Sequence, residues 1–220
     1  VPIFLIASNV RWVINAPILY SYGFDTYETA SRTGIERKEL LSAGGQIRRY
    51  FNDKSDTLAV KIVKDGILLQ NLYKEREVRH MQDVKGLVQG VYRIHEGLGA
   101  FTLAFIVVGF LGWRLKFMER LAYYLAYGAC LTVALIIAVG LASLAGFERL
   151  FLAFHQVGFS NDLWLLDPRT DYLLAMFPEA FFFDATLLIA GATAVSAIIV
   201  AMPCAVIKCI KWRTRHTRLT

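Results

Sequence analysis

The sequence predicts a predominantly α-helical polytopic membrane protein, with four transmembrane helices and a small α+β extracytoplasmic cap. Hydrophobic residues make up 56% of its 220 residues, and the mean hydropathy is +0.45, which is above the usual range for a soluble domain. The excess is concentrated in three stretches without a charged residue, at 97–113, 121–147 and 185–207. A helix of about 20 apolar residues crosses a hydrocarbon core roughly 30 Å thick, so each stretch predicts a span.

The fourth span is expected at residues 1–22, which are apolar apart from Arg11, Ser8 and two asparagines. The segment begins at Val1 and not at a methionine, which leaves the start of the helix undefined. A cleaved signal peptide is the alternative interpretation. We favour an uncleaved span because Arg11 interrupts the apolar run and no small-x-small cleavage site follows it.

Residues 23–96 have the pattern of a small folded cap. Thr33 and Glu36 have the spacing of a capping box before a helix that extends to about residue 51, with Gly44 and Gly45 as its weak point. The stretch 57–70 then predicts two short strands around a Lys-Asp-Gly turn. Apolar residues at helical spacing from residue 78 to 91 predict an amphipathic helix that leads into the span at 97–113.

The second half of the chain continues with a span at 121–147, an interfacial loop at 148–182, a span at 183–209 and a basic tail at 210–220. Lys and Arg residues concentrate in the short connection around residues 114–120 and in the tail, so both are expected to be cytoplasmic. Four spans then place both termini in the cytoplasm and the two longer connections outside.

The net charge of +6 is explained by this topology and by contact of the tail with anionic membrane lipids. The basic residues are not gathered on a soluble domain, so no nucleic acid is expected as a partner. The cysteines, Cys130, Cys204 and Cys209, lie in predicted spans or at their cytoplasmic ends. They therefore imply no disulfide framework.

Polar residues in the two outer connections are the candidates for a site. His80 and Asp83 are i, i+3 neighbours on the amphipathic helix, which suits a histidine oriented by a carboxylate, although a surface helix can carry such a pair without function. His155, Asn161 and Trp164 lie in an aromatic-rich stretch. Aromatic belts explain the rings at a membrane boundary but not the polar residues, which are costly there unless they are paired.

Two stretches, "LYKEREVRHMQDVK" and "FHQVGFSNDLWLLDPRTDYLLAMFPEAFF", resemble the bacterial integral membrane family that includes the lipoprotein intramolecular transacylase. The resemblance implies an acyltransferase of the bacterial cytoplasmic membrane that acts outside on a diacylglyceryl lipoprotein and needs no cofactor or metal. It would move the sn-2 acyl chain to the α-amino group of the N-terminal cysteine and give the lyso-form. His80, Asp83 and His155 match the residues of the family's motif.

The chemistry suits these residue types. An α-amine, with a pKa of about 7.7 to 8.0, must lose a proton before it attacks an ester, and a histidine is well matched as its general base. We assign His80 as the base and Asp83 as its orienting group, while His155 either stabilises the oxyanion or donates a proton to the departing sn-2 oxygen. The reverse assignment of the histidines stays open. Arg11, Asn161 and Trp164 are candidate substrate-binding residues.

Two other classes of protein remain as alternatives. His80, Asp83 and His155 are a possible ligand set for Zn²⁺ in a metal-dependent membrane hydrolase, although neither H-E-x-x-H nor a cysteine cluster is present. A non-enzymatic membrane protein with a partner-binding cap is the second alternative. In that case the apolar face of the cap would matter and the histidines would not.

Overall fold

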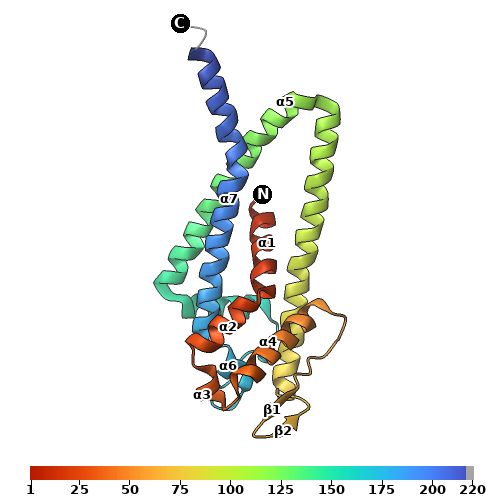
Figure 1. The fold of residues 1–220 in the computed structure, drawn as a ribbon, viewed down its shortest axis with the longest axis vertical. Helices are drawn as coiled ribbons and strands as arrows, with labels where there is room; N and C mark the ends of the chain where they lie inside the picture. Colours follow the sequence, from red (N-terminus) through yellow and green to blue (C-terminus); the bar gives the residue numbers. More distant parts are fainter. Residues whose placement is uncertain (217–220) are drawn as a thin grey trace. The chain divides into compact units, whose positions relative to one another are not determined.

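The computed structural model describes the backbone of residues 1–216 and their side chains except those of 115 and 208–216. Its elements, in order, are α1 (Pro2–Asn15), α2 (Pro17–Thr26), α3 (Thr29–Thr33), α4 (Arg37–Asn52), β1 (Ile62–Lys64), β2 (Ile67–Leu69), α5 (Glu75–Gly158), α6 (Tyr172–Met176) and α7 (Glu179–His216) (Figure 1). The chain folds into two compact units. One comprises residues 1–9, 93–141 and 189–220, and the other comprises 10–92 and 142–188.

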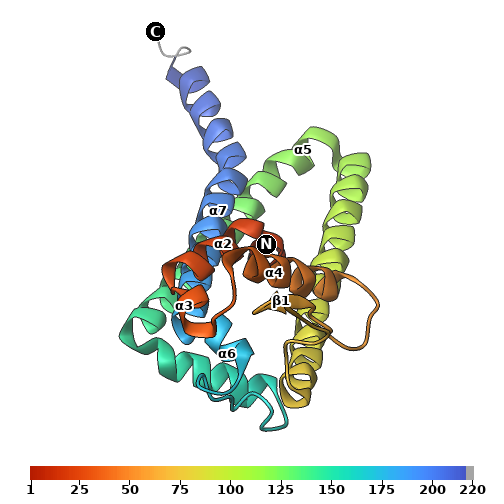
Figure 2. The same cartoon turned by 60° about the horizontal axis from the view of Figure 1, so that its bottom comes forward.

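Helix α4 supplies the core of the second unit. Its buried residues Leu40, Ala43, Ile47, Tyr50 and Phe51 follow helical spacing and line one face. This face packs against α2 and β1, while α3 packs against α2 and α6 (Figures 1 and 2). The helix continues through its two central glycines, where the predicted weak point lies.

The start of α4 differs from the expectation. Thr33 is the last residue of α3, and Gly34 follows it in the left-handed conformation, with φ of 66°. The residue before α4 is therefore Glu36. The predicted capping box at Thr33 was wrong, because Gly34 ends α3 directly after Thr33 and α4 starts only at Arg37.

The predicted hairpin is present as β1 and β2, which pair antiparallel with Lys64 opposite Ile67. Asp65 and Gly66 make its turn with φ values of 52° and 76°. Positive φ at both central residues is the type I′ requirement, which an Asp-Gly pair meets at low cost.

The first predicted span, 1–22, is divided into α1 and α2, which meet at an angle of 63°. Pro17 is the cause of the break. Its ring disfavours a helical Ala16, which is extended at φ −77° and ψ 117°, and the missing N–H of Pro17 suits the first position of a new helix.

Helix α5 contains the second and third predicted spans, in arms Glu75–Arg114 and Lys116–Gly158. Instead of the expected loop at 114–120, the left-handed Arg114, with φ of 47°, interrupts the helix, which reverses its direction there (Figure 1). The arms extend beyond the predicted spans 97–113 and 121–147. The end of the predicted cap, from Glu75 on, and the start of the predicted loop 148–182, up to Gly158, therefore belong to α5.

The first unit contains the remaining membrane-type packing. Leu5 of α1, Ala129 of α5 and Ala197 of α7 form its buried cluster. The two arms of α5, and also α7, are long and apolar enough to cross a membrane, and only 6 to 11% of the residues in their most apolar stretches are buried. Such outward apolar surface suits a hydrocarbon solvent. The side chains of the basic tail predicted at 210–220 lie outside the described residues, as does the backbone of 217–220.

Candidate active site

Two buried histidines converge near the two ends of α5. His80 is 6% exposed and His155 is 8% exposed, and their ring centroids lie 6.1 Å apart. Both belong to the second unit. The structure thus brings together the two histidines that the sequence singled out from separate outer connections.

Aromatic rings enclose this pair. Phe159 lies edge-on to His80 with ring centroids 5.1 Å apart and is tilted on His155 at 5.5 Å. Phe151 and Phe154 contact the ring of His155 from α5, at 4.4 and 5.3 Å. These rings help to bury the two imidazoles, and a low local dielectric strengthens electrostatic interactions there.

The imidazole of His155 is oriented by the backbone. Its Nδ1 lies 2.7 Å from the carbonyl oxygen of Phe151, one helical turn earlier. A carbonyl oxygen only accepts hydrogen bonds, so Nδ1 carries the proton in the neutral ring. Nε2 of His155 then has a free lone pair that can accept a proton.

His80 has the complementary arrangement. Its Nδ1 is buried and has no hydrogen-bond partner among the described residues. A neutral ring with its proton on Nε2 leaves no buried donor unsatisfied, whereas a proton on Nδ1 would have no acceptor. The two imidazoles therefore favour opposite tautomers, one presenting an acceptor and the other a donor.

Asp83 is held by a residue other than His80. Its Oδ2 accepts a hydrogen bond of 2.9 Å from Nδ2 of Asn161, and Oδ1 of Asn161 accepts the N–H of Leu163 at 3.0 Å. Among the described residues, no hydrogen bond joins Asp83 to His80. The carboxylate of Asp83 thus helps to hold the segment that follows α5, residues 159–173, which we call the strap.

The strap carries Trp164 onto the site. The indole is tilted against the ring of His155, with centroids 5.1 Å apart. Besides Asn161, the guanidinium of Arg76 in α5 holds the strap by donating to the backbone oxygen of Asp162 at 2.7 Å. Asn161 and Trp164, both expected as substrate-binding residues, lie at the site, the first as a tether and the second as a wall.

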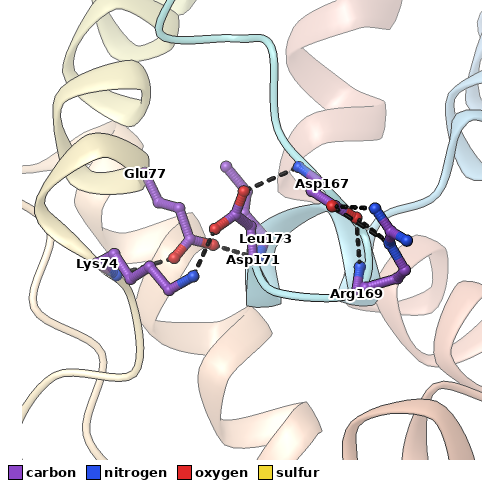
Figure 3. A network of polar contacts seen from close by, with 6 residues as sticks. All are labelled: Lys74, Glu77, Asp167, Arg169, Asp171 and Leu173. Atoms are coloured by element: carbon purple, nitrogen blue, oxygen red, sulfur yellow. Dashed lines mark hydrogen bonds and ion pairs between the residues drawn. The ribbon is translucent and has the colours of Figure 1, made fainter.

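A polar network fixes the far end of the strap to the start of α5 (Figure 3). Nζ of Lys74 lies 2.8 Å from Oδ1 of Asp171, and Oδ2 of Asp171 accepts the backbone N–H of Asp167 at 2.8 Å. Burial raises the pKa of Asp171, but the hydrogen bonds from Lys74 and Asp167 outweigh it and hold that pKa below its ordinary value. Hydrogen bonds from Arg169 lower the pKa of Asp167 to about 2.

Glu77 is the buried centre of this network and was not among the site residues predicted from the sequence. It is 0% exposed, and its carboxylate accepts the N–H of Lys74 at 2.8 Å and that of Leu173 at 2.6 Å (Figure 3). Lys74 precedes α5 and Leu173 is in the first turn of α6, so one carboxylate caps two helices. The position of Glu77, three residues after Lys74 at the start of a predicted helix, was the signal in the sequence that could have indicated a capping role.

Arg11 lies elsewhere in the second unit. Its guanidinium carbon is 4.5 Å from the ring centroid of Tyr92, and the hydroxyl of Tyr92 accepts a hydrogen bond from Asn15 at 2.6 Å. Tyr92 follows His80 by twelve residues on one helix, which corresponds to about 18 Å along the axis. Arg11 therefore lies away from the two histidines.

The ligand set of the alternative metal-site interpretation is not assembled among the described residues. Over the residues that the structure describes, no group of three or more His, Cys, Asp or Glu side chains is arranged to hold a metal ion. The bonding of Asp83 to Asn161 provides a local reason, because it commits one carboxylate oxygen to an amide.

Long apolar helices and a buried, aromatic-walled histidine pair define a helical membrane protein with the features of an acid–base site. The family model for the lipoprotein intramolecular transacylase Lit matches residues 1–182. The chain belongs to this family and is a multi-pass membrane protein.

Individual proteins are also similar to this chain. An uncharacterized protein of Aquifex aeolicus (strain VF5) is 25% identical over 185 residues, which cover 80% of this chain and 79% of that protein. The in meso structure of the membrane integral lipoprotein intramolecular transacylase Lit from Bacillus cereus has a TM-score of 0.74 at 20% identity, with 100% of this chain and 93% of that chain covered. The structure of the same protein with one histidine replaced by alanine has a TM-score of 0.69 at 20% identity, and the match covers 100% of this chain and 90% of that chain. These structures share the fold.

Proposed function

We propose that this protein is a lipoprotein intramolecular transacylase, an acyltransferase that works in the membrane without a metal or other cofactor. It moves the sn-2 acyl chain of a diacylglyceryl lipoprotein to the α-amino group of the N-terminal cysteine. The observation that carries the proposal is the buried pair of His80 and His155, with ring centroids 6.1 Å apart and opposite tautomers favoured. Family membership over residues 1–182 supports the same reaction class.

The tautomers favour the reverse of the roles first assigned to the histidines. Nε2 of His155 takes a proton from the neutral form of the α-amine as its nitrogen attacks the sn-2 ester carbonyl. Nε2–H of His80 donates a hydrogen bond to the oxyanion of the tetrahedral intermediate. Asp83, instead of orienting a histidine directly, positions the strap through Asn161 and adds a negative charge near the pair.

The second half of the reaction uses the same proton. The tetrahedral intermediate collapses, the bond between the acyl carbon and the sn-2 oxygen breaks, and the imidazolium of His155 returns its proton to that oxygen. The products are an amide at the cysteine and a free sn-2 hydroxyl, so atoms and charges balance. The substrate supplies its own nucleophile, and no acyl-enzyme is required.

The topology of the proposal is the one that the loop charges favour, with both termini cytoplasmic and the histidines outside the cytoplasmic membrane. Trp164 and Phe159 would exclude water from the ester. The exposed apolar faces of α5 and α7 would leave the acyl chains in the hydrocarbon region, and Arg11 beside Tyr92 would contact a distant polar part of the substrate.

Mass spectrometry of a lipoprotein's N-terminal peptide tests the proposal. The host is a bacterium that cannot otherwise N-acylate its lipoproteins, and it carries the unaltered gene, His155→Ala, His80→Ala or the empty vector. His95→Ala is the matched histidine control, since His95 stacks on Phe4, with centroids 5.0 Å apart, in the other unit.

An N-acylated, mono-O-acylated peptide is expected with the unaltered gene and with His95→Ala only. An unchanged diacylglyceryl peptide in all strains, with the protein present in the membrane, would refute the transacylase. Activity that disappears on chelation and returns with Zn²⁺ would instead favour the hydrolase. Function that survives both histidine substitutions would favour a partner-binding cap.

A further inference from the structure

A hollow between α2 and α4 lies on the second unit and is not part of the histidine site. It measures about 570 Å³, and its lining includes Pro17, Ile18 and Tyr20 from α2 and Leu41, Gly44 and Gly45 from α4. Ile18 is 69% exposed. Most of the lining is apolar, so the hollow offers water a poor surface and a hydrocarbon chain a good one.

The two glycines shape this hollow. A Cβ on Gly44 would meet the ring of Tyr20 at 3.1 Å, so this glycine allows α2 and α4 to approach. A Cβ on Gly45 would have only Nη1 of Arg49 near it, at 3.8 Å. The space beside Gly45 is therefore open, and a larger side chain at this position would project into it.

Positive charge borders the apolar surface. Arg48 lines the hollow and is held in place, since its Nη1 donates to the backbone oxygen of Asn15 at 3.0 Å. Arg49 is exposed and its guanidinium lies beside Gly45. The lining contains no acidic residue. A hydrocarbon-lined hollow bordered by two guanidiniums complements a lipid with an anionic head group.

We propose that this hollow binds one membrane phospholipid, with an acyl chain against Ile18, Leu41 and Gly45 and the phosphate at Arg48 and Arg49. Its place in the chain favours a lipid over a soluble anion. The hollow begins at Pro17, directly after the 63° bend between α1 and α2, and so lies within the bent helix pair that is apolar enough to count as one membrane span. Inorganic phosphate would also leave the apolar surface of the hollow uncovered, since it has no hydrocarbon part.

Native mass spectrometry of the full chain tests this proposal. The purified, delipidated protein is mixed with detergent micelles that contain phosphatidylglycerol, or diacylglycerol as the uncharged lipid, and the bound lipid per protein is counted. We expect one phosphatidylglycerol to be retained and diacylglycerol to bind at least fivefold less. Equal retention of the two lipids would overturn the role of the guanidiniums.

Variants separate the acyl-chain and phosphate contacts. Gly45→Leu should lower retention at least fivefold by filling the hollow, and its fold is secure because leucine is the better helix former. Arg48→Gln should lower it similarly, Arg48→Lys should retain most of it, and Lys38→Gln, an exposed charge in the same helix, should match the unaltered protein. Unchanged retention in both Gly45→Leu and Arg48→Gln would refute the site.

The result is independent of the transacylase proposal. His80→Ala should bind phosphatidylglycerol as the unaltered protein does while losing acyl transfer. Gly45→Leu should lose the lipid without touching the histidines. Lipid retention and acyl transfer therefore report separately on the lipid site and on the transacylase, so that either proposal can fail without the other.

Discussion

Nδ1 of His155 lies 2.7 Å from the carbonyl oxygen of Phe151, so a backbone group and not a carboxylate sets the orientation of this imidazole. His155 is also in the last turn of α5, where its own carbonyl accepts the N–H of Phe159 at 3.0 Å. The end of one helix thus fixes both the ring and the adjacent aromatic wall. A backbone acceptor keeps the proton on Nδ1 without adding charge beside the reacting groups.

Glutamine substitutions should distinguish the roles of the two histidines. A glutamine amide donates a hydrogen bond but is not a base, so His80→Gln should keep at least tenfold more transacylase activity than His80→Ala. His155→Gln should be as inactive as His155→Ala, with a loss of about 10² to 10⁴. Initial rates of lyso-form production by mass spectrometry measure this. Higher activity in His155→Gln than in His80→Gln would restore the opposite assignment.

An exchange of Asp83 and Asn161 should test the tether of the strap. Asn161→Asp places two carboxylates together and should lower activity more than Asn161→Ala, because like charges repel. Asp83→Asn combined with Asn161→Asp again supplies one amide donor and one carboxylate acceptor, and should recover at least tenfold over Asn161→Asp. Failure of the exchange to recover activity, in protein of unchanged thermal midpoint, would mean that the charge at position 83 is itself required.

Removal of the Glu77 carboxylate should destabilise the protein. Glu77→Ala leaves the N–H groups of Lys74 and Leu173 without their acceptor, at about 1 to 3 kcal/mol for each buried group. Glu77→Gln keeps one acceptor oxygen and should be intermediate. Thermal unfolding of the purified protein, followed by circular dichroism, should rank the midpoints in that order. Glu75→Ala, at an exposed acid paired with Arg79, is the control and should change little.

The network around Asp171 should make stability sensitive to acid. The pKa of Asp171 is lower in the folded protein than its ordinary value, so its contribution is complete above the unfolded pKa of about 3.9 and is lost as pH falls through the folded pKa. Asp171→Asn should have a lower thermal midpoint than the unaltered protein at pH 7, and this gap should narrow below about pH 4. Asp65→Asn, in the exposed hairpin turn, should show no such gap. A gap that stays constant with pH would contradict the assignment.

Local signals in the sequence predicted much of the architecture. Charge-free apolar stretches locate both arms of α5 and α7, since the length needed to cross a bilayer depends on composition alone. The Asp65-Gly66 pair predicted the hairpin because its backbone requirement is local. The break at Ala16 was not anticipated, although Pro17 offered a local signal for it. The reversal at Arg114 falls in the connection expected at 114–120 from its basic residues, but its form, a single left-handed residue within a helix, was not anticipated.

The candidate site was only partly accessible from sequence. His80 and His155 were singled out as polar residues in apolar surroundings, but their roles depend on partners far away in the chain or in the backbone. The i, i+3 spacing suggested that Asp83 accepts a hydrogen bond from His80, whereas its carboxylate accepts one from Asn161. A charged side chain takes the partner with the best geometry, which a helical spacing alone does not determine.

The sequence by itself determined a membrane-spanning helical chain, its hairpin and the two histidines, because each depends on composition or on neighbours within a few residues. Only the tertiary structure decided that the histidine rings lie together, that Asp83 binds Asn161, and that buried Glu77 caps two helices. Those contacts join positions up to 96 residues apart, as between Glu77 and Leu173. Their formation depends on burial and hydrogen-bond geometry that exist only once the chain has folded.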